Sequence, residues 1–241
     1  MQQGTPEDVA RGRCWFVDSR GLVEKSRTDL AAHKRPYAHD HAPIAGLLAA
    51  VDALRPAALI GVSGQPQTFT RPVIEAMSAI NARPIIFALS NPTSQSECTA
   101  EQAYHWSEGR AIFASGSPFA PVEYRGRTFV SGQSNNSYIF PGVGLGVIAA
   151  GATRVTDDMF LAAARTLADM VSEDDLAHGS TFPPLARIRE ISAAIATVVA
   201  RLARDLGLAT NSLPVDPAGY VRSLMYDPSE HAASLAAVAD R

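Results

Sequence analysis

Short apolar runs that alternate with helical segments constrain the fold more than any other feature of the sequence. Leu59–Val62, Pro84–Leu89 and Ala111–Phe113 have the length of strands, and each stops at polar or turn-forming residues. These runs lack the polar alternation of a half-exposed strand, which indicates that both of their faces are covered. Strands of this kind, separated by helices, are typical of a parallel sheet. The sequence therefore predicts the α/β class, with a doubly wound parallel sheet.

Helix-start signals lie between and after these runs. Thr70 stands ahead of a proline that suits the first helical turn, and Thr99 with Gln102 has the spacing of a capping box. Two later segments, 157–171 and 185–206, have the apolar stripe of amphipathic helices and predict a C-terminal helical cap on the sheet. We therefore expect one domain over residues 1–210. A tail over 211–241 follows, in which only 235–239 has helical spacing.

Composition excludes several classes of partner. The 241 residues are 46% hydrophobic and 19% charged, and the net charge of −3 is spread without a basic stripe. This distribution argues against nucleic acid and against a polybasic membrane anchor. The longest apolar stretch, 143–152, is too short to span a membrane. Cys14 and Cys98 lie far apart and form neither a disulfide framework nor a zinc motif, which favours a reducing cytoplasm.

An amide side chain follows the apolar run Pro84–Leu89 almost directly. Asn91 is placed there, and Pro92 after it disfavours helical geometry at Asn91. In an open parallel sheet, ligands bind beyond the carboxyl ends of the strands, where polar groups are left unpaired. We therefore expect Asn91 to project into a crevice above the sheet.

A second polar cluster, 132–138, contains Asn135 and Asn136 and follows the strand-like residues 128–130. Two loops with asparagines at strand ends predict one small polar ligand between them. A simpler alternative is that Asn91, Asn135 and Asn136 only satisfy backbone groups in turns, as asparagine often does.

Three other patterns need an interpretation. Cys14–Asp18 is predicted to be a buried strand that ends at a carboxylate. The sequence 144–149 fits G-x-G-x-x-A, yet it opens a late helix with no acidic strand after it, so we expect close helix packing there. The run 39–41 reads His-Asp-His but lacks further ligands at metal-binding spacing, and no metal site is predicted in this chain.

Four segments together resemble one enzyme family. They are "WFVDSRGLV", "RPIIFALSNPTSQSECTAEQAYHWSEGRAIFASGSPF", "GQSNNSYIFPGVGLGVI" and "FPPLARIREIS". In the same order, they are similar to the carboxyl-terminal dinucleotide domain of the malic enzymes. The resemblance implies a Rossmann-like NAD(P)-binding domain. It also implies oxidative decarboxylation of malate to pyruvate and CO2, with reduction of NADP or NAD and with Mn²⁺ or Mg²⁺ in the complete enzyme.

The resemblance also implies roles for individual residues. The positions that match substrate-orienting amides are Asn91 and Asn136. The positions that match cofactor contacts are Asp18, Ser19, Arg20, Arg27, Lys34, Val62, Ser63, Asn91 and Asn135. Asp18 would accept hydrogen bonds from the adenine ribose, and cations near it would suit a 2′-phosphate, which favours NADP over NAD. For Arg27, a solvated loop arginine is an equally good interpretation.

Other parts of the family pattern would precede Met1 of this chain. They are the general-acid tyrosine, the general-base lysine, the acidic metal ligands and the glycine-rich loop that follows the first strand. We therefore expect a sheet without its first strand and a fragment without catalytic residues or metal ligands. The chain would be inactive alone and would need a missing amino-terminal half, in a complete enzyme that is a homo-oligomer. The alternative is a noncatalytic dinucleotide-domain module.

Overall fold

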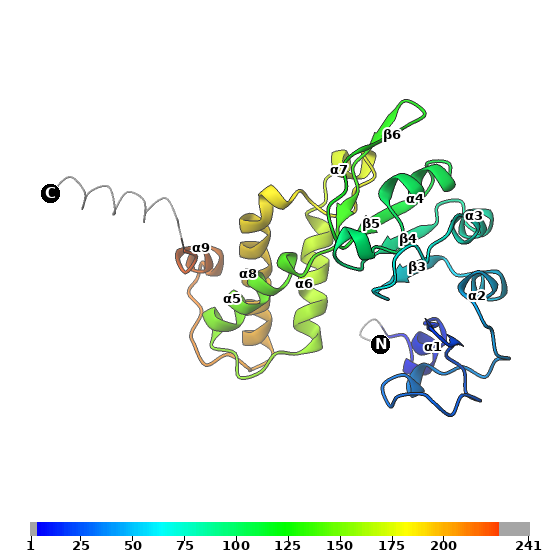
Figure 1. The fold of residues 1–241 in the computed structure, drawn as a ribbon. Coiled ribbons are helices and arrows are strands. Elements are labelled where there is room, and N and C mark those ends of the chain that lie inside the picture. The colour runs from blue at the N-terminus through cyan, green and yellow to red at the C-terminus, as the bar shows by residue number, and fades with distance from the viewer. Residues whose placement is uncertain (1–3, 227–241) are drawn as a thin grey trace. The chain divides into compact units, whose positions relative to one another are not determined.

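The computed structural model describes residues 4–226 of the chain (Figure 1). Within them the backbone divides into two compact units. The first unit comprises residues up to Asn135 together with Val171–Pro183, and the second comprises Asn136–Met170 together with the residues from Pro184 onward.

A four-stranded parallel sheet forms the centre of the first unit. Its strand order is β3 (Ala58–Gly61), β4 (Ile85–Ala88), β5 (Ile112–Ser115) and β8 (Gly132–Gln133). Three helices, which group beside these strands in Figure 1, are α2 (Leu47–Leu54), α3 (Arg71–Ile80) and α4 (Ala100–Trp106). The capping box at Thr99 is present, whereas the Thr70 side chain makes no capping bond at the start of α3. The predicted α/β class with a parallel sheet is confirmed.

The core of this unit lies against one face of the sheet. Leu59, Ile86 and Phe113 are aligned across the three strands, and all are buried. They belong to a cluster with Met77 of α3 and Tyr104 of α4. Burying a side chain of this size stabilises the fold by about 1.5–3 kcal/mol.

The other face of the sheet is covered less completely. Ile60 is 58% exposed, and its register partner Phe87 is half-buried. Val62, which directly follows β3, is 76% exposed. Within the described residues, the first unit therefore covers its sheet unequally on the two faces.

The expected buried strand at Cys14–Asp18 is wrong. Only β1 (Val17–Asp18) is extended, and it pairs antiparallel with β2 (Gly21–Leu22) instead of joining the large sheet. Cys14 is exposed and Phe16 is 46% exposed. A buried strand needs hydrogen-bonding neighbours and covered faces, and the described residues give this one only its own hairpin. The same segment contains α1 (Glu7–Gly12) and the 3-10 turn η1 (Arg35–Tyr37).

A hairpin explains the residues that resembled a strand at 128–130. It consists of β6 (Val122–Tyr124) and β7 (Arg127–Phe129), paired antiparallel outside the parallel sheet. The strand that leads to Asn135 is β8, which lies inside the polar cluster itself. The first unit also contains the 3-10 turn η2 (Thr93–Gln95) and the short helix α7 (Glu173–Ala177).

The second unit is helical. It contains η3 (Asn136–Tyr138), α5 (Phe140–Ala150), α6 (Asp157–Asp169), η4 (Leu185–Arg187), α8 (Ile188–Asp205) and α9 (Pro217–Ser223). The helices predicted over 157–171 and 185–206 are therefore present. In the predicted tail, α9 is a helix that sequence periodicity did not indicate, and the predicted helical residues 235–239 lie outside the described residues.

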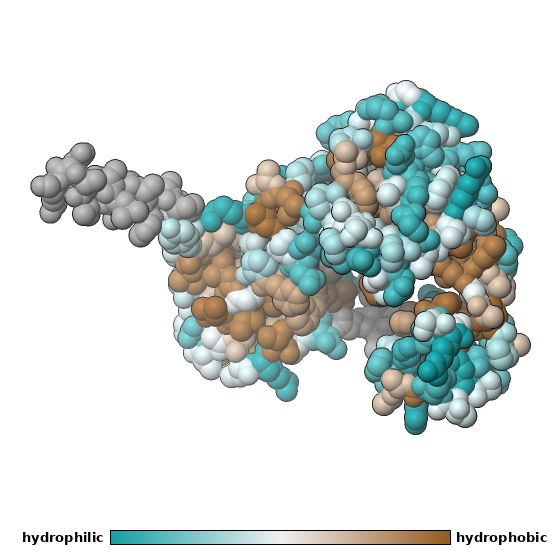
Figure 2. Space-filling model, in the orientation of Figure 1, coloured by the Kyte–Doolittle hydropathy of each residue, from teal (hydrophilic) through white to brown (hydrophobic). Residues whose placement is uncertain are grey.

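Close packing of α5 on α8 explains most of the glycine pattern. A Cβ on Gly142 would lie 2.7 Å from the Ile195 side chain, and one on Gly146 would lie 2.6 Å from the Ala196 carbonyl oxygen. Gly144 has open space instead. The pattern at 144–149 is thus a helix-packing feature, as expected, but the glycines that allow it are Gly142 and Gly146. Figure 2 shows apolar residues at the surface of this unit. Ile148, for example, is 72% exposed.

Candidate functional site

Asn91 is held at the carboxyl end of the sheet by the end of β5. Its Oδ1 atom accepts a hydrogen bond of 2.5 Å from the Ser117 hydroxyl. A Cβ on Gly116 would lie 2.8 Å from the same Oδ1 atom and 2.2 Å from the Leu89 carbonyl oxygen, so only glycine permits this approach. The Asn91–Pro92 peptide bond is cis. Asn91 is exposed, and its Nδ2 group makes no hydrogen bond within the described residues, so it can donate to a ligand.

Glu97 is a buried carboxylate that sequence reasoning missed. It is 1% exposed, and its Oε1 atom accepts hydrogen bonds from the Ser63 amide, the Ser63 hydroxyl and the Ser90 hydroxyl. Burial by itself would raise the pKa of Glu97, but the hydrogen bonds from Ser90 and Ser63 outweigh it and hold that pKa below its ordinary value. Glu97 therefore joins the loop after β3 to the loop after β4. Hydrophobic periodicity gives no sign of Glu97. Its burial depends on hydrogen-bond partners that only the folded structure brings to it.

Asp18 lies in the N-terminal segment, surrounded by donors. Oδ1 accepts from the Arg20 amide at 3.0 Å and from Arg27 Nη1 at 2.9 Å. Oδ2 accepts from Arg27 Nη2 at 3.2 Å and from Lys34 Nζ at 2.6 Å. The hydrogen bond from Arg27 is the main cause of an Asp18 pKa far below its usual range, and Lys34 acts in the same direction against the effect of burial. Four residues that the resemblance assigns to the cofactor, Asp18, Arg20, Arg27 and Lys34, are thus in mutual contact, and their role toward a cofactor stays a prediction.

Asp29 completes this group of charges, and no sequence pattern indicated it. Its carboxylate accepts from Arg27 Nε at 3.1 Å, from Arg27 Nη2 at 2.9 Å and from Arg20 Nη1 at 2.8 Å. The hydrogen bond from Arg27 is the main cause that lowers the pKa of Asp29 to about 2. The Arg27 side chain is only 12% exposed, so it is not a solvated loop arginine. Three cations surround two carboxylates, which leaves a formal excess of one positive charge.

The remaining predicted site residues lie on loops and turns. Ser19 is exposed in the turn between β1 and β2, and Val62 and Ser63 follow β3 on its exposed loop. Asn135 ends the first unit, whereas Asn136 begins η3 in the second. The structure thus places Asn91 and Asn136 in different units.

The described part of the chain contains neither a metal-binding cluster nor a membrane-spanning helix. Among residues 4–226, no group of three or more His, Cys, Asp or Glu side chains could hold a metal ion. The divalent metal implied by the resemblance therefore has no donor set there. In the same residues, no helix is both long enough and apolar enough to cross a membrane.

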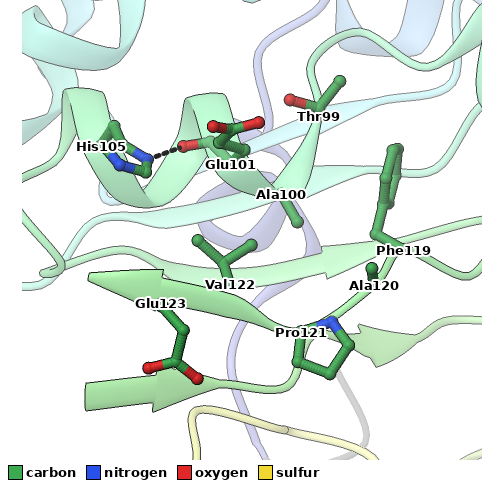
Figure 3. Close-up of a pocket in the computed structure, with 9 residues that line it drawn as sticks. All are labelled: Thr99, Ala100, Glu101, His105, Phe119, Ala120, Pro121, Val122 and Glu123. Atoms are coloured by element: carbon green, nitrogen blue, oxygen red, sulfur yellow. Dashed lines mark hydrogen bonds between the residues drawn. The ribbon is translucent and has the colours of Figure 1, made fainter. Parts of the chain in front are cut away.

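An open groove of about 480 Å³ lies between α4 and the β6–β7 hairpin (Figure 3). Glu101, His105 and Glu123 are its charged or titratable side chains, and His105 Nδ1 is bonded to the Glu101 carbonyl oxygen at 2.8 Å. None of the predicted substrate or cofactor residues lines this groove. Part of its lining, Phe119–Pro121, belongs to the loop after β5, two residues beyond the Ser117 that contacts Asn91.

Comparison with known proteins identifies the family. A family model described as "Malic enzyme, NAD binding domain" matches residues 1–204. The chloroplastic NADP-dependent malic enzyme of Solanum lycopersicum is 57% identical over 230 residues, which are 95% of this chain and 40% of that protein. The chloroplastic NADP-dependent malic enzyme of Zea mays is 56% identical over 229 residues, covering 94% and 36% respectively. The chain thus spans about two fifths of the length of these relatives.

Solved structures agree with this result. The Entamoeba histolytica malic enzyme has a TM-score of 0.69 at 24% identity, over 94% of this chain and 44% of that one, which shows a shared fold. The malic enzyme of Pyrococcus horikoshii has a TM-score of 0.55 at 26% identity, over 74% and 36%. From the family match, together with the parallel sheet, it follows that this chain belongs to the malic enzyme family and corresponds to its NAD-binding domain.

Proposed function

We propose that this chain supplies the cofactor-binding and substrate-orienting part of an NADP-dependent malic enzyme, which converts malate to pyruvate and CO2. The observation that carries the cofactor choice is the charge group around Asp18. The named plant relatives, which use NADP, support the choice. The alternative of a noncatalytic dinucleotide module is retained as an outcome of the activity experiment below.

The preference for NADP follows from the donors around Asp18. A carboxylate that binds the ribose of NAD needs acceptor positions to spare, whereas a 2′-phosphate needs cations. Both oxygens of Asp18 already accept two hydrogen bonds each, three of the four from Arg27 and Lys34. The Lys34 ammonium group makes a single hydrogen bond among the described residues, and the Arg20 side chain is 69% exposed. Arg20 and Lys34 can therefore donate to a phosphate, with Ser19 beside them, while Arg27 holds Asp18 in place.

Neutral side chains would contact the reacting part of the ligands. The bound dinucleotide supplies the acceptor for the hydride that leaves malate. Asn91 presents its Nδ2 donor, and Asn136 would add a second amide donor. These neutral groups would orient the carboxylates of malate. Because they carry no charge, they would not hold back the carboxylate that leaves as CO2. Val62 offers an exposed apolar surface beside Ser63, and Asn135 would complete the cofactor contacts.

Cofactor choice can be tested on the 241-residue chain by calorimetric titration with NADPH and NADH. We expect NADPH to bind more tightly. Lys34→Ala should weaken NADPH binding about fivefold to tenfold, because one charge-assisted hydrogen bond is lost. NADH affinity should not fall, since Asp18 regains an acceptor position. Lys25→Ala is the matched control, because Lys25 is an exposed lysine of the same segment without a side-chain bond among the described residues. Equal affinity for the two dinucleotides in the unchanged chain would contradict the NADP assignment.

Substrate orientation can be tested in a chimera in which this chain replaces the matching segment of the tomato enzyme. Asn91→Ala should lower kcat/KM for malate about tenfold to a hundredfold, because a partner is lost in a desolvated site. KM for NADP should change much less than malate kinetics, and Thr93→Ala, an exposed change in the same loop, is the control. Unchanged malate kinetics in the variant would make Asn91 a turn former. A chimera that binds NADPH but never oxidises malate would favour the noncatalytic module.

Further features of the complete enzyme belong to the proposal. The isolated chain should not reduce NADP with malate, because it is proposed to lack the acid, the base and the metal ligands. A separate amino-terminal part, a divalent metal held by that part, and a homo-oligomeric assembly would complete the enzyme. The cytoplasmic location stays a prediction from cysteine usage, and the tomato and maize relatives are chloroplastic.

A further inference from the structure

Two loops at the carboxyl edge of the sheet are tied to one buried carboxylate. Ser63 and Gly64 belong to the loop after β3, and Ser90 belongs to the loop after β4. Glu97 approaches both from the segment that leads to α4, between the buried residues Ser96 and Cys98. All of these residues lie in the first unit.

The hydrogen bonds form a continuous path between the loops. The Gly64 amide donates to the Ser90 hydroxyl at 2.8 Å, and that hydroxyl donates to Glu97 Oε1 at 2.5 Å. The Ser63 amide and hydroxyl donate to the same oxygen at 3.0 Å and 2.9 Å. The Ser90 amide donates to Oε2 at 3.3 Å. Glu97 therefore fixes the backbone of both loops directly and orients Gly64 through Ser90.

The space for this carboxylate is built into β3. A Cβ on Gly61 would lie 2.5 Å from the Glu97 carboxyl carbon and 2.8 Å from the Phe69 ring. The backbone of Glu97 is fixed as well, because its carbonyl oxygen accepts from the Phe69 amide at 3.0 Å. A single acceptor group thus satisfies backbone donors that would otherwise be unpaired or turned toward the crevice.

We propose that Glu97 is a positioning residue, which holds the loop of Val62 and Ser63 at a fixed distance from the loop of Asn91 so that both can contact a dinucleotide. This inference rests on the proposed function, because the two loops carry residues assigned there to cofactor and substrate. Glu97 itself touches neither ligand. Its effect on binding comes from the geometry of Ser63 and Ser90, and a shift of about 1 Å in such loops is enough to impair a bound reactant's alignment.

The effect of Glu97 can be measured in the 241-residue chain. Glu97→Gln keeps the shape of the side chain but replaces one oxygen with a donor and removes the charge. We expect hydrogen exchange at the Ser63, Gly64 and Ser90 amides to rise about tenfold, while exchange at the amides of β4 stays unchanged. NADPH affinity should fall about tenfold. Glu97→Asp keeps the charge on a side chain that is shorter by one methylene group. In this variant we expect smaller changes in both hydrogen exchange and NADPH affinity than in Glu97→Gln.

Matched variants separate positioning from general destabilisation. Glu101→Gln removes an exposed carboxylate from the same region and should leave exchange and affinity as they are. Ser90→Ala removes the hydroxyl between Gly64 and Glu97, and Ser96→Ala removes a neighbouring buried hydroxyl that bonds to the Cys98 carbonyl oxygen. Ser90→Ala should weaken NADPH binding about threefold to fivefold, whereas Ser96→Ala should not. If Glu97→Gln fails to fold, the comparison of Ser90→Ala with Ser96→Ala tests the positioning role instead.

The possible results discriminate between this inference and the proposed function. If the unchanged chain binds NADPH and both Glu97→Gln and Ser90→Ala bind it equally well, Glu97 is only a structural residue and the inference is overturned alone. If neither the unchanged chain nor the chimera that carries it binds NADPH, the proposed function fails and this inference fails with it. Faster exchange at Gly64 together with weaker NADPH binding, in both variants, supports the inference.

Discussion

Two carboxylates of the first unit, Glu97 and Asp18, hold their surroundings together by different means. Neutral serine and backbone donors surround the buried Glu97, whereas cations and a single backbone amide surround the partly exposed Asp18. The pKa of each lies below its ordinary value, so the direction of the shift alone does not distinguish them. The environment of Glu97 depends on packing, and that of Asp18 depends on charge. We therefore expect the two sites to respond differently to volume changes, salt and acid.

The largest effect should come from adding volume beside Glu97. Gly61→Ala places a methyl group where the Glu97 carboxylate and the Phe69 ring now lie. We expect the free energy of unfolding to fall by about 3 kcal/mol, because overpacking adds to the loss of buried hydrogen bonds. Thermal or urea unfolding of the chain measures this.

Gly144→Ala is the matched control for that change. A Cβ at Gly144 of α5 meets no atom within 4 Å, and alanine favours a helix. The control should be neutral or slightly stabilising. A Gly61→Ala chain that unfolds at the unchanged midpoint would show that the loops around Glu97 can move without cost.

A smaller effect should come from removing the cation that Asp18 and Asp29 share. Arg27→Ala should lower Tm by about 3–5 °C at low salt, because two partly covered carboxylates lose their main partner. Arg71→Ala, in an exposed pair with Glu75, should change Tm by less than about 1 °C.

Salt then separates the two carboxylates. In 1 M NaCl the difference between Arg27→Ala and the unchanged chain should shrink in part, because Asp18 and Asp29 are partly exposed and salt screens charges that solvent reaches. The loss in Gly61→Ala should stay the same, since it arises from packing. If salt reduced both losses equally, the distinction between a packed and a charged site would be wrong.

The smallest effect is the acid response of Asp29. Its pKa in the folded chain is about 2, below the ordinary value of 3.8, so its contribution to stability is fully present above about pH 4. This contribution is lost as the pH falls through the interval between these values. Asp29→Asn should therefore lose less stability than the unchanged chain between pH 4 and pH 2. Unfolding midpoints across this range test it, and parallel curves would contradict it.

Local chemistry explains the elements that could be predicted. The capping box at Thr99 and the helices α6 and α8 depend on residues near each other in the chain, and the parallel strands β3, β4 and β5 are marked by uninterrupted apolar runs. Cys14–Asp18 has the same kind of run and was predicted wrongly. An apolar run shows only that a segment is able to be buried. Among the described residues, Cys14–Asp18 does not pair with any strand of the large parallel sheet.

The candidate site residues differ in the same way: those with a local sequence signal could be predicted, and those that depend on distant contacts could not. The amide at Asn91 and the carboxylate at Asp18 stand beside strand and turn signals, so their positions could be inferred. Asp29 and Glu97 lack such a signal. Asp29 is recognised only because Arg27 reaches it, and Glu97 only because Ser63 and Ser90, 34 and 7 residues away in the sequence, donate to it.

By itself the sequence determined the α/β class, the strand ends at which polar side chains emerge, and the malic enzyme family, because these depend on local pattern and on long motifs. Only the tertiary structure decided which donors surround each carboxylate, which glycines allow close approach, and which face of the sheet is covered. Such features depend on contacts between residues distant in the chain. A buried charge or a missing Cβ is stable there only when its particular neighbours are in place.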